Sequence, residues 1–313
     1  MRFLKRKTHF NFLGNTPRKV ALVFSAIVII VSIVSLSTRG LEFGIDFTGG
    51  ILLEVGYQEA ADLGGIRSNL ADAGFEDAQV LRFGADTDVL VRLPPQDGVN
   101  PDELREQLRA TVAVGTTGVD LRRVEFVSPQ VGKELTERGG LAMIIALMLI
   151  FVYVMVRFQW KFAAGAVTAL MHDVIVTVGF FSLFGFSFDL TVVAAVLAVI
   201  GYSLNDTVVA FDRIRENFFK LRGISAEDSM NTSINEMLAR TIITGVTTLL
   251  VLVALLLLGG ESIAPFSIAL IVGIVVGTYS SIWTASATAL SLGVNAQDLL
   301  EPIKDPDLID DLP

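Results

Sequence analysis

Asp206 is the one charged residue in an apolar stretch that runs from Leu190 to Phe211. If this stretch crosses a bilayer as a helix, the carboxylate costs about a few kcal/mol or more, and such residues are functional candidates by default. Asp206 lies 16 residues beyond Leu190, about 24 Å along a helix, and its side chain leans back toward Leu190. We therefore expect Asp206 to face other protein groups and to take up a proton. The alternative is that the span ends near Asn205 and leaves Asp206 at the interface.

Arg240, Asp173 and His172 are the other ionisable residues beside or inside apolar stretches. Arg240 begins an uncharged stretch at about the depth of Asp206. There it either keeps the carboxylate ionised until a proton arrives or serves only as an interfacial anchor. Asp173 lies near the middle of another stretch, with His172 beside it. Adjacent helical residues point about 100° apart, so we expect the two not to form one site. Each either extends a proton path or forms hydrogen bonds across the helices.

Small residues accompany these ionisable groups. Gly201 and Asn205 share a stripe of small side chains on the helix that carries Asp206. Gly273-x-x-x-Gly277 is a second small-residue pattern, in the last apolar stretch. Small side chains let membrane helices approach each other closely. We therefore assign Gly201, Asn205, Gly273 and Gly277 to helix packing.

The elements that must position these residues are membrane-spanning helices. Of the 313 residues, 52% are hydrophobic and 18% charged, whereas soluble proteins carry about 25% charged residues. A helix needs roughly 20 apolar residues to cross the hydrocarbon core, and the sequence holds six such stretches. The first is predicted to be a retained anchor, because its apolar run is too long for a signal peptide. The predicted spans are residues 20–38, 139–156, 162–184, 190–211, 240–259 and 265–289.

Lys and Arg predict the orientation of these spans. They gather in segments 1–19, 157–161 and 212–239, and the short loops on the opposite side carry none. Because positively charged loops stay in the cytoplasm, both termini are predicted to be cytoplasmic and residues 39–138 to lie in the periplasm. Segment 212–239 is amphipathic and is expected to form a helix on the inner membrane surface. Residues 290–313 are predicted to be an acidic cytoplasmic tail.

The segment between the first two spans has the pattern of a small α+β domain. Its fold is predicted to be the split, ferredoxin-like arrangement βαββαβ. That fold hosts many functions, and no nucleophile–base pair or phosphate loop is present, so we expect a binding or mechanical domain and not an enzyme. The strand patterns lie at 50–57, 78–83, 88–93 and 120–127, and the helix patterns near 60–73 and 101–112.

Composition argues against several kinds of site. The chain has no Cys, which excludes disulfides and thiolate metal sites. Its two His, His9 and His172, are too few for a histidine-rich metal centre. The net charge is −9 and no basic patch suited to nucleic acid is present. We therefore expect no cofactor, no metal and no nucleic-acid partner.

Four motifs occur in order along the chain. They are FGIDFTGG at 43–50, VSPQVG at 127–132, HDV at 172–174 and GYSLNDTVVAFDRIRE at 201–216. Together they resemble the SecF subunits of the bacterial Sec secretion machinery, which belong to the RND superfamily. The resemblance extends over the whole predicted membrane architecture, from about residue 40 to residue 290. It implies a six-helix bundle of RND type in the bacterial inner membrane.

The resemblance also implies partners and residue roles. SecF pairs with SecD, whose spans complete the bundle, and the pair associates with the SecYEG channel and with YajC. It uses the proton-motive force to draw preproteins outward, so protons are the coupling ion. The essential aspartate of the family matches Asp206 and its functional arginine matches Arg240. His172 and Asp173 match a family motif whose role stays open.

Two other functions are compatible with the sequence alone. One is an RND-type, proton-driven exporter of small molecules or lipids, although such chains usually carry two outer domains and more spans. The other is a passive scaffold that steadies the export channel. A buried Asp206 favours proton-driven protein export over the scaffold, because a scaffold has no use for an ionisable group inside the membrane.

Overall fold

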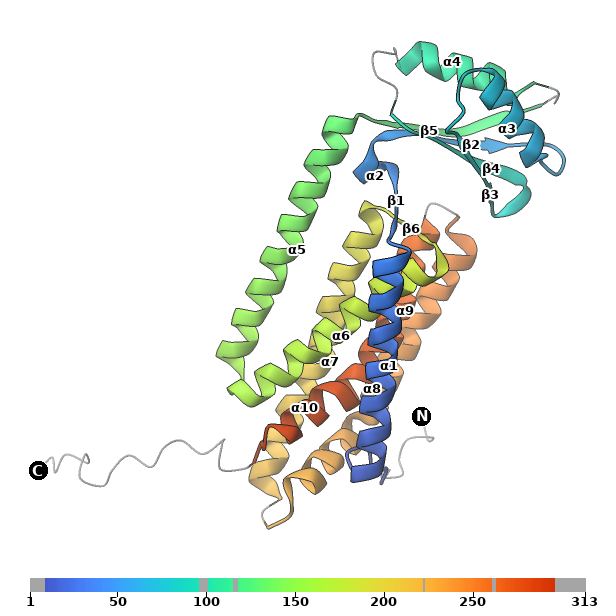
Figure 1. Cartoon of the computed structure of the whole chain (residues 1–313). Coiled ribbons are helices and arrows are strands. Elements are labelled where there is room, and N and C mark those ends of the chain that lie inside the picture. Colours follow the sequence, from blue (N-terminus) through green and yellow to red (C-terminus); the bar gives the residue numbers. More distant parts are fainter. Residues whose placement is uncertain (1–8, 96–100, 115–117, 222, 261–262, 296–313) are drawn as a thin grey trace, which may run out of the picture.

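The computed structural model describes residues 9–95, 101–114, 118–221, 223–260 and 263–295. It shows a bundle of long helices with a sheet domain at one end (Figure 1). We call the end of the bundle beside the sheet the domain end. The opposite end, where the first long helix begins, is called the far end.

Six helices in the described part of the chain are long and apolar enough to cross a membrane. The last of them continues through one π-helical turn, Ser281–Ala285, into the short helix α10 (Ser286–Ser291). Helices α6, α7 and α9 are the most buried, whereas α5 buries only two of its residues. The six helices are α1 (Asn15–Thr38), α5 (Pro129–Arg157), α6 (Trp160–Phe184), α7 (Leu190–Lys220), α8 (Ala226–Leu258) and α9 (Ala264–Ser280).

Capping residues mark the ends of several of these helices. Asp189 precedes α7 and its carboxylate accepts a hydrogen bond from the backbone N–H of Val192 at 3.0 Å. Ser225 precedes α8 and accepts in the same way from Asp228 at 3.1 Å. Both contacts satisfy an N–H group that the first helical turn leaves without a partner. Gly185 ends α6 in the left-handed conformation, with a φ of 65°, which glycine adopts without strain.

Segment 212–239 does not form a separate helix on a membrane surface, so that prediction is wrong. Helices α7 and α8 extend into it from both sides and meet at a short turn. Ile214 and Phe218 of α7 pack with Met230 and Ile234 of α8 in one hydrophobic cluster. A helix face turned toward a neighbouring helix has the same periodicity as one turned toward lipid headgroups. The amphipathic pattern alone therefore could not distinguish the two.

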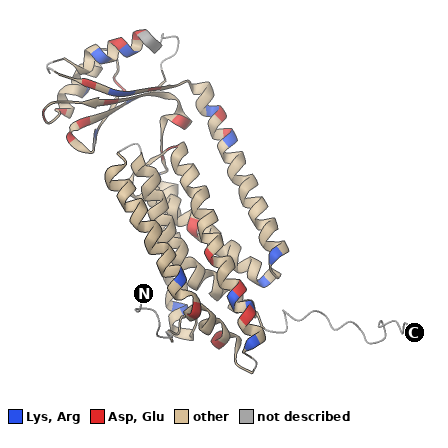
Figure 2. Cartoon of the chain, turned by 180° about the vertical axis from the view of Figure 1, so that it is seen from behind, with Lys and Arg blue, Asp and Glu red and all other residues tan. Residues whose placement is uncertain are grey.

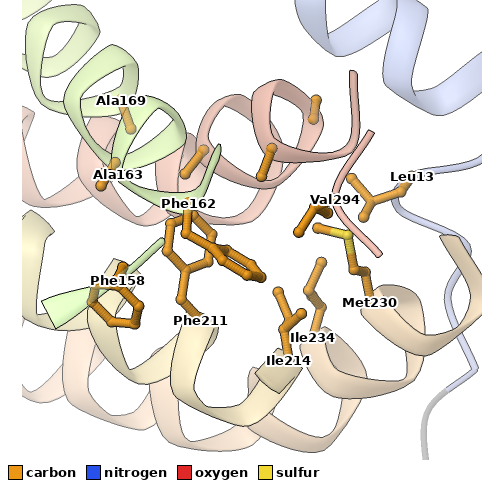
Figure 3. Packing of buried hydrophobic residues seen from close by; sticks show 14 of the residues in the cluster. Leu13, Phe158, Phe162, Ala163, Ala169, Phe211, Ile214, Met230, Ile234 and Val294 are labelled. Atoms are coloured by element: carbon orange, nitrogen blue, oxygen red, sulfur yellow. The ribbon is translucent and has the colours of Figure 1, made fainter. Parts of the chain in front are cut away.

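A hydrophobic cluster holds the helices together at the far end. Figure 3 shows Phe162 of α6 and Phe211 of α7 side by side, with ring centroids 4.9 Å apart. Leu13, in the segment before α1, is fully buried in the same cluster. Its backbone N–H donates to the side-chain oxygen of Asn231 in α8 at 3.0 Å. Leu13, just before α1, is thus part of the folded bundle.

The sheet domain follows the chain order strand, helix, strand, strand, helix, strand. Its four strands are all antiparallel in the order β3-β4-β2-β5, and both helices cover the same face of the sheet (Figure 1). The elements are β2 (Gly50–Gly56), α3 (Leu63–Asp72), β3 (Gln79–Phe83), β4 (Ala85–Leu93), α4 (Pro101–Val112) and β5 (Asp120–Val127).

Alternating apolar residues form the core of the sheet domain. Leu53 and Val55 of β2 and Val89 of β4 are fully buried, as the two-residue period of a strand requires when one face is covered. The Tyr57 hydroxyl, at the end of β2, donates to the backbone oxygen of Val112 at 3.0 Å. Burial raises the pKa of Tyr57 to about 12. This hydrogen bond ties the end of α4 to the sheet.

Polar contacts join the sheet domain to the bundle. Strand β1 (Glu42–Phe43) pairs in parallel with β6 (Ser187–Phe188), which lies just before α7. The carboxylate of Asp46 accepts from the backbone N–H of Leu190 at 2.9 Å. Arg92 of β4 donates to the Ser187 hydroxyl at 2.7 Å. The start of α7 is therefore fixed to the segment that leads into the sheet.

Glycines make the joint between the bundle and the sheet. After the short helix α2 (Ile45–Thr48), Gly49 and Gly50 have φ angles of 72° and 121°, a region that side chains disfavour. A Cβ on Gly50 would lie 2.3 Å from the backbone oxygen of Leu93. A Cβ on Gly132 of α5 would lie 2.9 Å from the backbone nitrogen of Gly49. Helix α5 therefore begins directly against this turn.

Candidate functional site

The carboxylate of Asp206 is only half satisfied. Asp206 is 9% exposed, and its Oδ1 accepts a hydrogen bond from the Thr241 hydroxyl of α8 at 3.3 Å. Its Oδ2 is buried without a hydrogen-bond partner among the described residues. Because a buried polar atom without a partner is costly, this oxygen is suited to gain a proton or another bonding partner.

A small cavity adjoins this carboxylate. It has a volume of about 10 Å³ and lies where α7, α8 and α9 meet, which is about the space that one water molecule requires. Its remaining lining is mostly apolar, apart from two hydroxyl groups. The lining residues are Asp206, Ala210, Ile234, Met237, Leu238, Thr241, Ser281 and Ile282. The cavity thus offers room for a water molecule beside the carboxyl-bearing residue.

Arg240 lies beside this site without contacting it. It precedes Thr241 on α8 and its side chain is exposed. In the described part of the chain, the ion pairs closer than 4 Å do not include one between Arg240 and Asp206. Its charge still acts on the Asp206 carboxylate through space. The structure therefore places Thr241 in direct contact and Arg240 as a more distant positive charge.

Asp173 forms a second buried centre, in the middle of α6. It is fully buried, and its Oδ2 accepts hydrogen bonds from Ser203 of α7 at 2.5 Å and from Ser280 of α9 at 2.8 Å. Three helices that are distant in sequence therefore meet at one carboxylate. Such shared hydrogen bonds in a low-dielectric interior strengthen one another.

His172 and Asp173 belong to the same site, contrary to the expectation from the sequence. The Nδ1 atom of His172 lies 3.0 Å from Oδ1 of Asp173. Their Cα–Cβ bonds do diverge by about 100°, but two flexible side chains can bridge that separation. The His172 ring also lies against Tyr279, with ring centroids 6.0 Å apart. The Tyr279 hydroxyl donates to the backbone oxygen of Ala21 at 2.7 Å, which links the centre to α1.

Hydroxyl groups lie between the two carboxylates, and sequence reasoning missed them. Thr207 follows Asp206 on α7, and its Oγ1 lies 2.9 Å from the Oγ of Ser281. Ser281 also lines the cavity beside Asp206 and begins the π-helical turn. Turns of this kind are often found at functional sites. The consecutive Ser280 and Ser281 inside an apolar stretch were the signal that could have indicated them.

Two glycines of α9 lie at its close contact with α7. A Cβ on Gly273 would lie 2.1 Å from a methyl group of Val199 on α7, and one on Gly277 would lie 3.1 Å from the Cβ of Ser203. This approach brings the hydroxyl of Ser280 to Asp173. Gly201 has open space where its Cβ would be, and Asn205 is exposed in this single chain.

Charged residues avoid the middle of the bundle. Figure 2 shows them mainly on the sheet domain and at the far end, where Arg157 pairs with Asp212 at 2.7 Å. No group of three or more His, Asp or Glu residues in the described part of the chain could hold a metal ion. The buried ionisable groups of the bundle therefore stand out against an almost uncharged interior.

Comparison with known proteins shows one family throughout. Residues 108–295 match the family described as protein export membrane protein SecD/SecF, C-terminal. Residues 34–61 match the SecD/SecF GG motif, which includes Gly49 and Gly50.

The similar curated proteins include protein translocase subunits SecF from several bacteria. The one from Vibrio alginolyticus is 52% identical over 285 residues, which cover 91% of this chain and 90% of the relative. The one from Pseudomonas aeruginosa is 48% identical over 305 residues, 97% of each chain. The one from Escherichia coli O157:H7 is 42% identical over 283 residues, 90% of this chain and 88% of the relative.

Solved structures show the same relationship. The translocon-associated membrane protein SecDF from Thermus thermophilus superposes with a TM-score of 0.83 at 35% identity. The match covers 93% of this chain but only 39% of the SecDF chain. SecDF in a super-membrane-facing form superposes with a TM-score of 0.66.

The fold and the buried carboxylates define a multi-pass membrane protein with ionisable groups enclosed between its helices. Its relatives extend over almost the whole chain at high identity. The chain belongs to the SecF family of protein translocase subunits. It is therefore an accessory subunit of Sec protein translocation.

Proposed function

We propose that this subunit drives protein export with the proton-motive force and that Asp206 is the group that binds and releases the proton. The observation that carries the proposal is the unpartnered Oδ2 of Asp206, buried beside a cavity where three helices meet. A proton that crosses the full potential delivers about 2.3 kcal/mol per 100 mV. That free energy is enough to shift a two-state equilibrium by more than about tenfold.

Protonation changes what holds the three helices around Asp206 together. The ionised carboxylate accepts from Thr241 and attracts the positive charge of Arg240. The neutral acid loses most of that attraction and gains a donor, which favours a different packing of α7 against α8. Uptake of the proton from the outer side and release to the cytosol would then alternate the two packings. Asp173 and His172 are the second part of this relay in our proposal.

We assign the partner of this chain as SecD, and the wider assembly as the SecYEG channel with YajC and a translocating preprotein. The name SecDF describes a solved chain of which this one covers 39%, which leaves room for a second subunit. The helix surface around Gly201 and Asn205 is exposed and lined by small residues. A helix of SecD packed on this stripe would cover Asp206 more completely.

A cross-linking experiment tests this assignment. The chain contains no Cys, so a single Cys introduced at Gly201 should form a disulfide with single Cys residues in one helix of SecD. A single Cys at Leu149, exposed on α5, is the matched control. Cross-linking from Leu149 but not from Gly201 would contradict the assignment of this surface.

We further propose a bacterial inner-membrane location with both termini in the cytoplasm and residues 39–138 in the periplasm. We assign the membrane spans as predicted from the sequence, and we assign a ferredoxin-like fold to the periplasmic domain. The strand order β3-β4-β2-β5 supports this fold. The positive residues Arg157, at the end of α5, and Lys161, in the first turn of α6, support the orientation. Single Cys residues at Arg82 and at Lys161 should react with a membrane-impermeant thiol reagent from opposite sides.

Export into vesicles tests the proton function directly. The Asp206→Asn variant, assembled with SecD, should lose the part of export that depends on the proton gradient and keep the part driven by the cytoplasmic motor. Asp212→Asn, on the same helix but exposed in an ion pair, should behave like the wild type, because exposed pairs contribute little. Full gradient-driven export by Asp206→Asn would refute the proposal and leave a passive scaffold. Gradient-driven efflux of small molecules or lipids without any effect on export would favour an exporter.

A further inference from the structure

The hydroxyl groups between Asp206 and Asp173 make a connection that the sequence did not suggest. On α7, Ser203 and Thr207 are four residues apart and therefore lie on the same side of the helix. On the facing segment, Ser280 and Ser281 are consecutive. Ser203 and Ser280 both donate to Asp173, whereas Thr207 contacts Ser281. The four hydroxyls thus form two adjacent pairs across one helix contact.

The two pairs meet at a shared backbone acceptor. The Ser280 and Ser281 hydroxyls both lie within hydrogen-bond distance of the backbone oxygen of Gly277, at 3.1 Å and 2.8 Å. Ser281 also lies 3.5 Å from the backbone oxygen of Ser203. All four hydroxyl-bearing residues are at most 2% exposed. The two pairs are therefore buried around one carbonyl group, that of Gly277.

The π-helical turn is what places Ser281 at this position. It starts at Ser281, directly after the close approach of α9 to α7. Ser281 faces Thr207 and at the same time lines the cavity beside Asp206. Asp206, whose Oδ2 has no hydrogen-bond partner in the described structure, is also among the residues that line this cavity. A water molecule in the cavity would lie between Asp206 and Ser281.

We propose that Ser281, with Thr207, carries a proton between Asp206 and Asp173, and that Asp173 is the second protonation site of the relay. This inference rests on the proposed proton function of Asp206. Protonated Asp206 gives its proton to a water molecule in the cavity, which passes one of its own protons to the Ser281 hydroxyl. The hydroxyl groups then pass a proton on to Asp173. The water and each hydroxyl gain one proton and lose one. The net result is one proton moved, with Asp206 ionised and Asp173 neutral.

Paired substitutions test the path. Thr207→Val removes the hydroxyl at nearly constant volume, and Thr207→Ser keeps it. Ser281→Ala removes the second hydroxyl, and Ser267→Ala removes a buried serine hydroxyl elsewhere on α9 as the matched control. Each variant is assembled with SecD in vesicles. Gradient-driven export and proton entry, read by a pH-sensitive dye inside the vesicles, are measured together with motor-driven export.

The expected pattern separates a proton path from a structural contact. Ser281→Ala and Thr207→Val should slow proton entry and gradient-driven export by at least about tenfold, because a positioned proton-transfer group is removed. Thr207→Ser and Ser267→Ala should keep both rates, and motor-driven export should be unchanged in all four. Asp173→Asn should abolish gradient-driven export while the complex still assembles.

Two results would overturn the inference. If Ser281→Ala and Thr207→Val match Ser267→Ala, the hydroxyls carry no proton. If Asp173→Asn keeps gradient-driven export, Asp173 is not a protonation site. Both results are compatible with the proposed function, provided that Asp206→Asn abolishes gradient-driven export. Gradient-driven export by Asp206→Asn would instead refute the proposed function itself.

Discussion

The two buried carboxylates of the bundle are satisfied to very different degrees. Asp173 has hydrogen-bond partners on both oxygens, from its own helix and from two others. Asp206 has one long hydrogen bond and one oxygen without a partner in the described structure. The first holds three helices in register, whereas the second leaves its surroundings able to change. Burial alone therefore does not tell how firmly a carboxylate is held by its surroundings.

Replacing each carboxylate in turn should give the largest difference in stability between the two centres. Asp173→Leu leaves the hydroxyl of Ser203 without its acceptor and that of Ser280 with only the backbone oxygen of Gly277. Since each orphaned buried polar group costs about 1–3 kcal/mol, we expect a clear fall in the thermal unfolding temperature of the purified chain. Asp206→Leu should change that temperature little. Equal destabilisation by the two variants would show that the two centres do not differ in this way.

Substitution of one glycine should disturb the Asp173 centre next most strongly. Gly273→Leu forces a side chain into the contact with Val199, where even a Cβ would be 2.1 Å from a methyl group. Overpacking of this kind costs about 1–3 kcal/mol and should separate Ser280 from Asp173. Thermal unfolding of the purified chain measures it. Gly201→Leu, at an open position, should leave the isolated chain unchanged but weaken co-purification with SecD.

Loss of the single donor to Asp206 should have a smaller effect. Thr241→Val removes the 3.3 Å hydrogen bond and keeps the shape of the side chain. We expect a loss of about 1 kcal/mol or less in stability, because the bond is long, but a measurable change in gradient-driven export. Thr244→Val, whose hydroxyl bonds only to the backbone of its own helix, is the control. A stability loss as large as that of Asp173→Leu would mean that Asp206 is held as firmly as Asp173.

An effect of similar size, and one that depends on pH, is expected in the sheet domain. The pKa of Tyr57 is raised to about 12 from an ordinary value of about 10. Its contribution to stability is therefore complete below pH 10 and is lost as the pH rises toward 12. Tyr57 is the one tyrosine of residues 39–138. Tyr57→Phe should cost about 1 kcal/mol and remove one late tyrosine ionisation from an ultraviolet titration. A wild-type titration without a late-ionising tyrosine would contradict this account.

Much of the bundle could be predicted from the sequence because its signals are local. The length of each apolar stretch is read directly from the sequence. A carboxylate inside such a stretch, as at Asp206, is also recognised without knowledge of its neighbours in space. Capping residues such as Asp189 act within a single helical turn. Hydropathy could not distinguish a lipid face from a helix contact, which is why segment 212–239 was misjudged.

The partners of the site could not be predicted in the same way. Asp173 is joined to Ser203 and Ser280, which lie 30 and 107 residues further along the chain. No periodicity connects positions that distant. The His172–Asp173 contact depends on side-chain rotation, which a helical-wheel argument ignores. The position of the π-helical turn follows from packing around Ser281, and helix propensities do not encode it.

The contact between Asp46 and the start of α7 has a consequence for how the protein is made. These two groups are separated by 144 residues. At about 5–20 residues per second of synthesis, the carboxylate is made roughly 7 to 30 seconds before its partner. During that interval the newly made sheet domain is attached through the Gly49–Gly50 turn, without the hydrogen bond between Asp46 and Leu190. The step that fixes the sheet domain against the start of α7 therefore comes after the domain itself has been made.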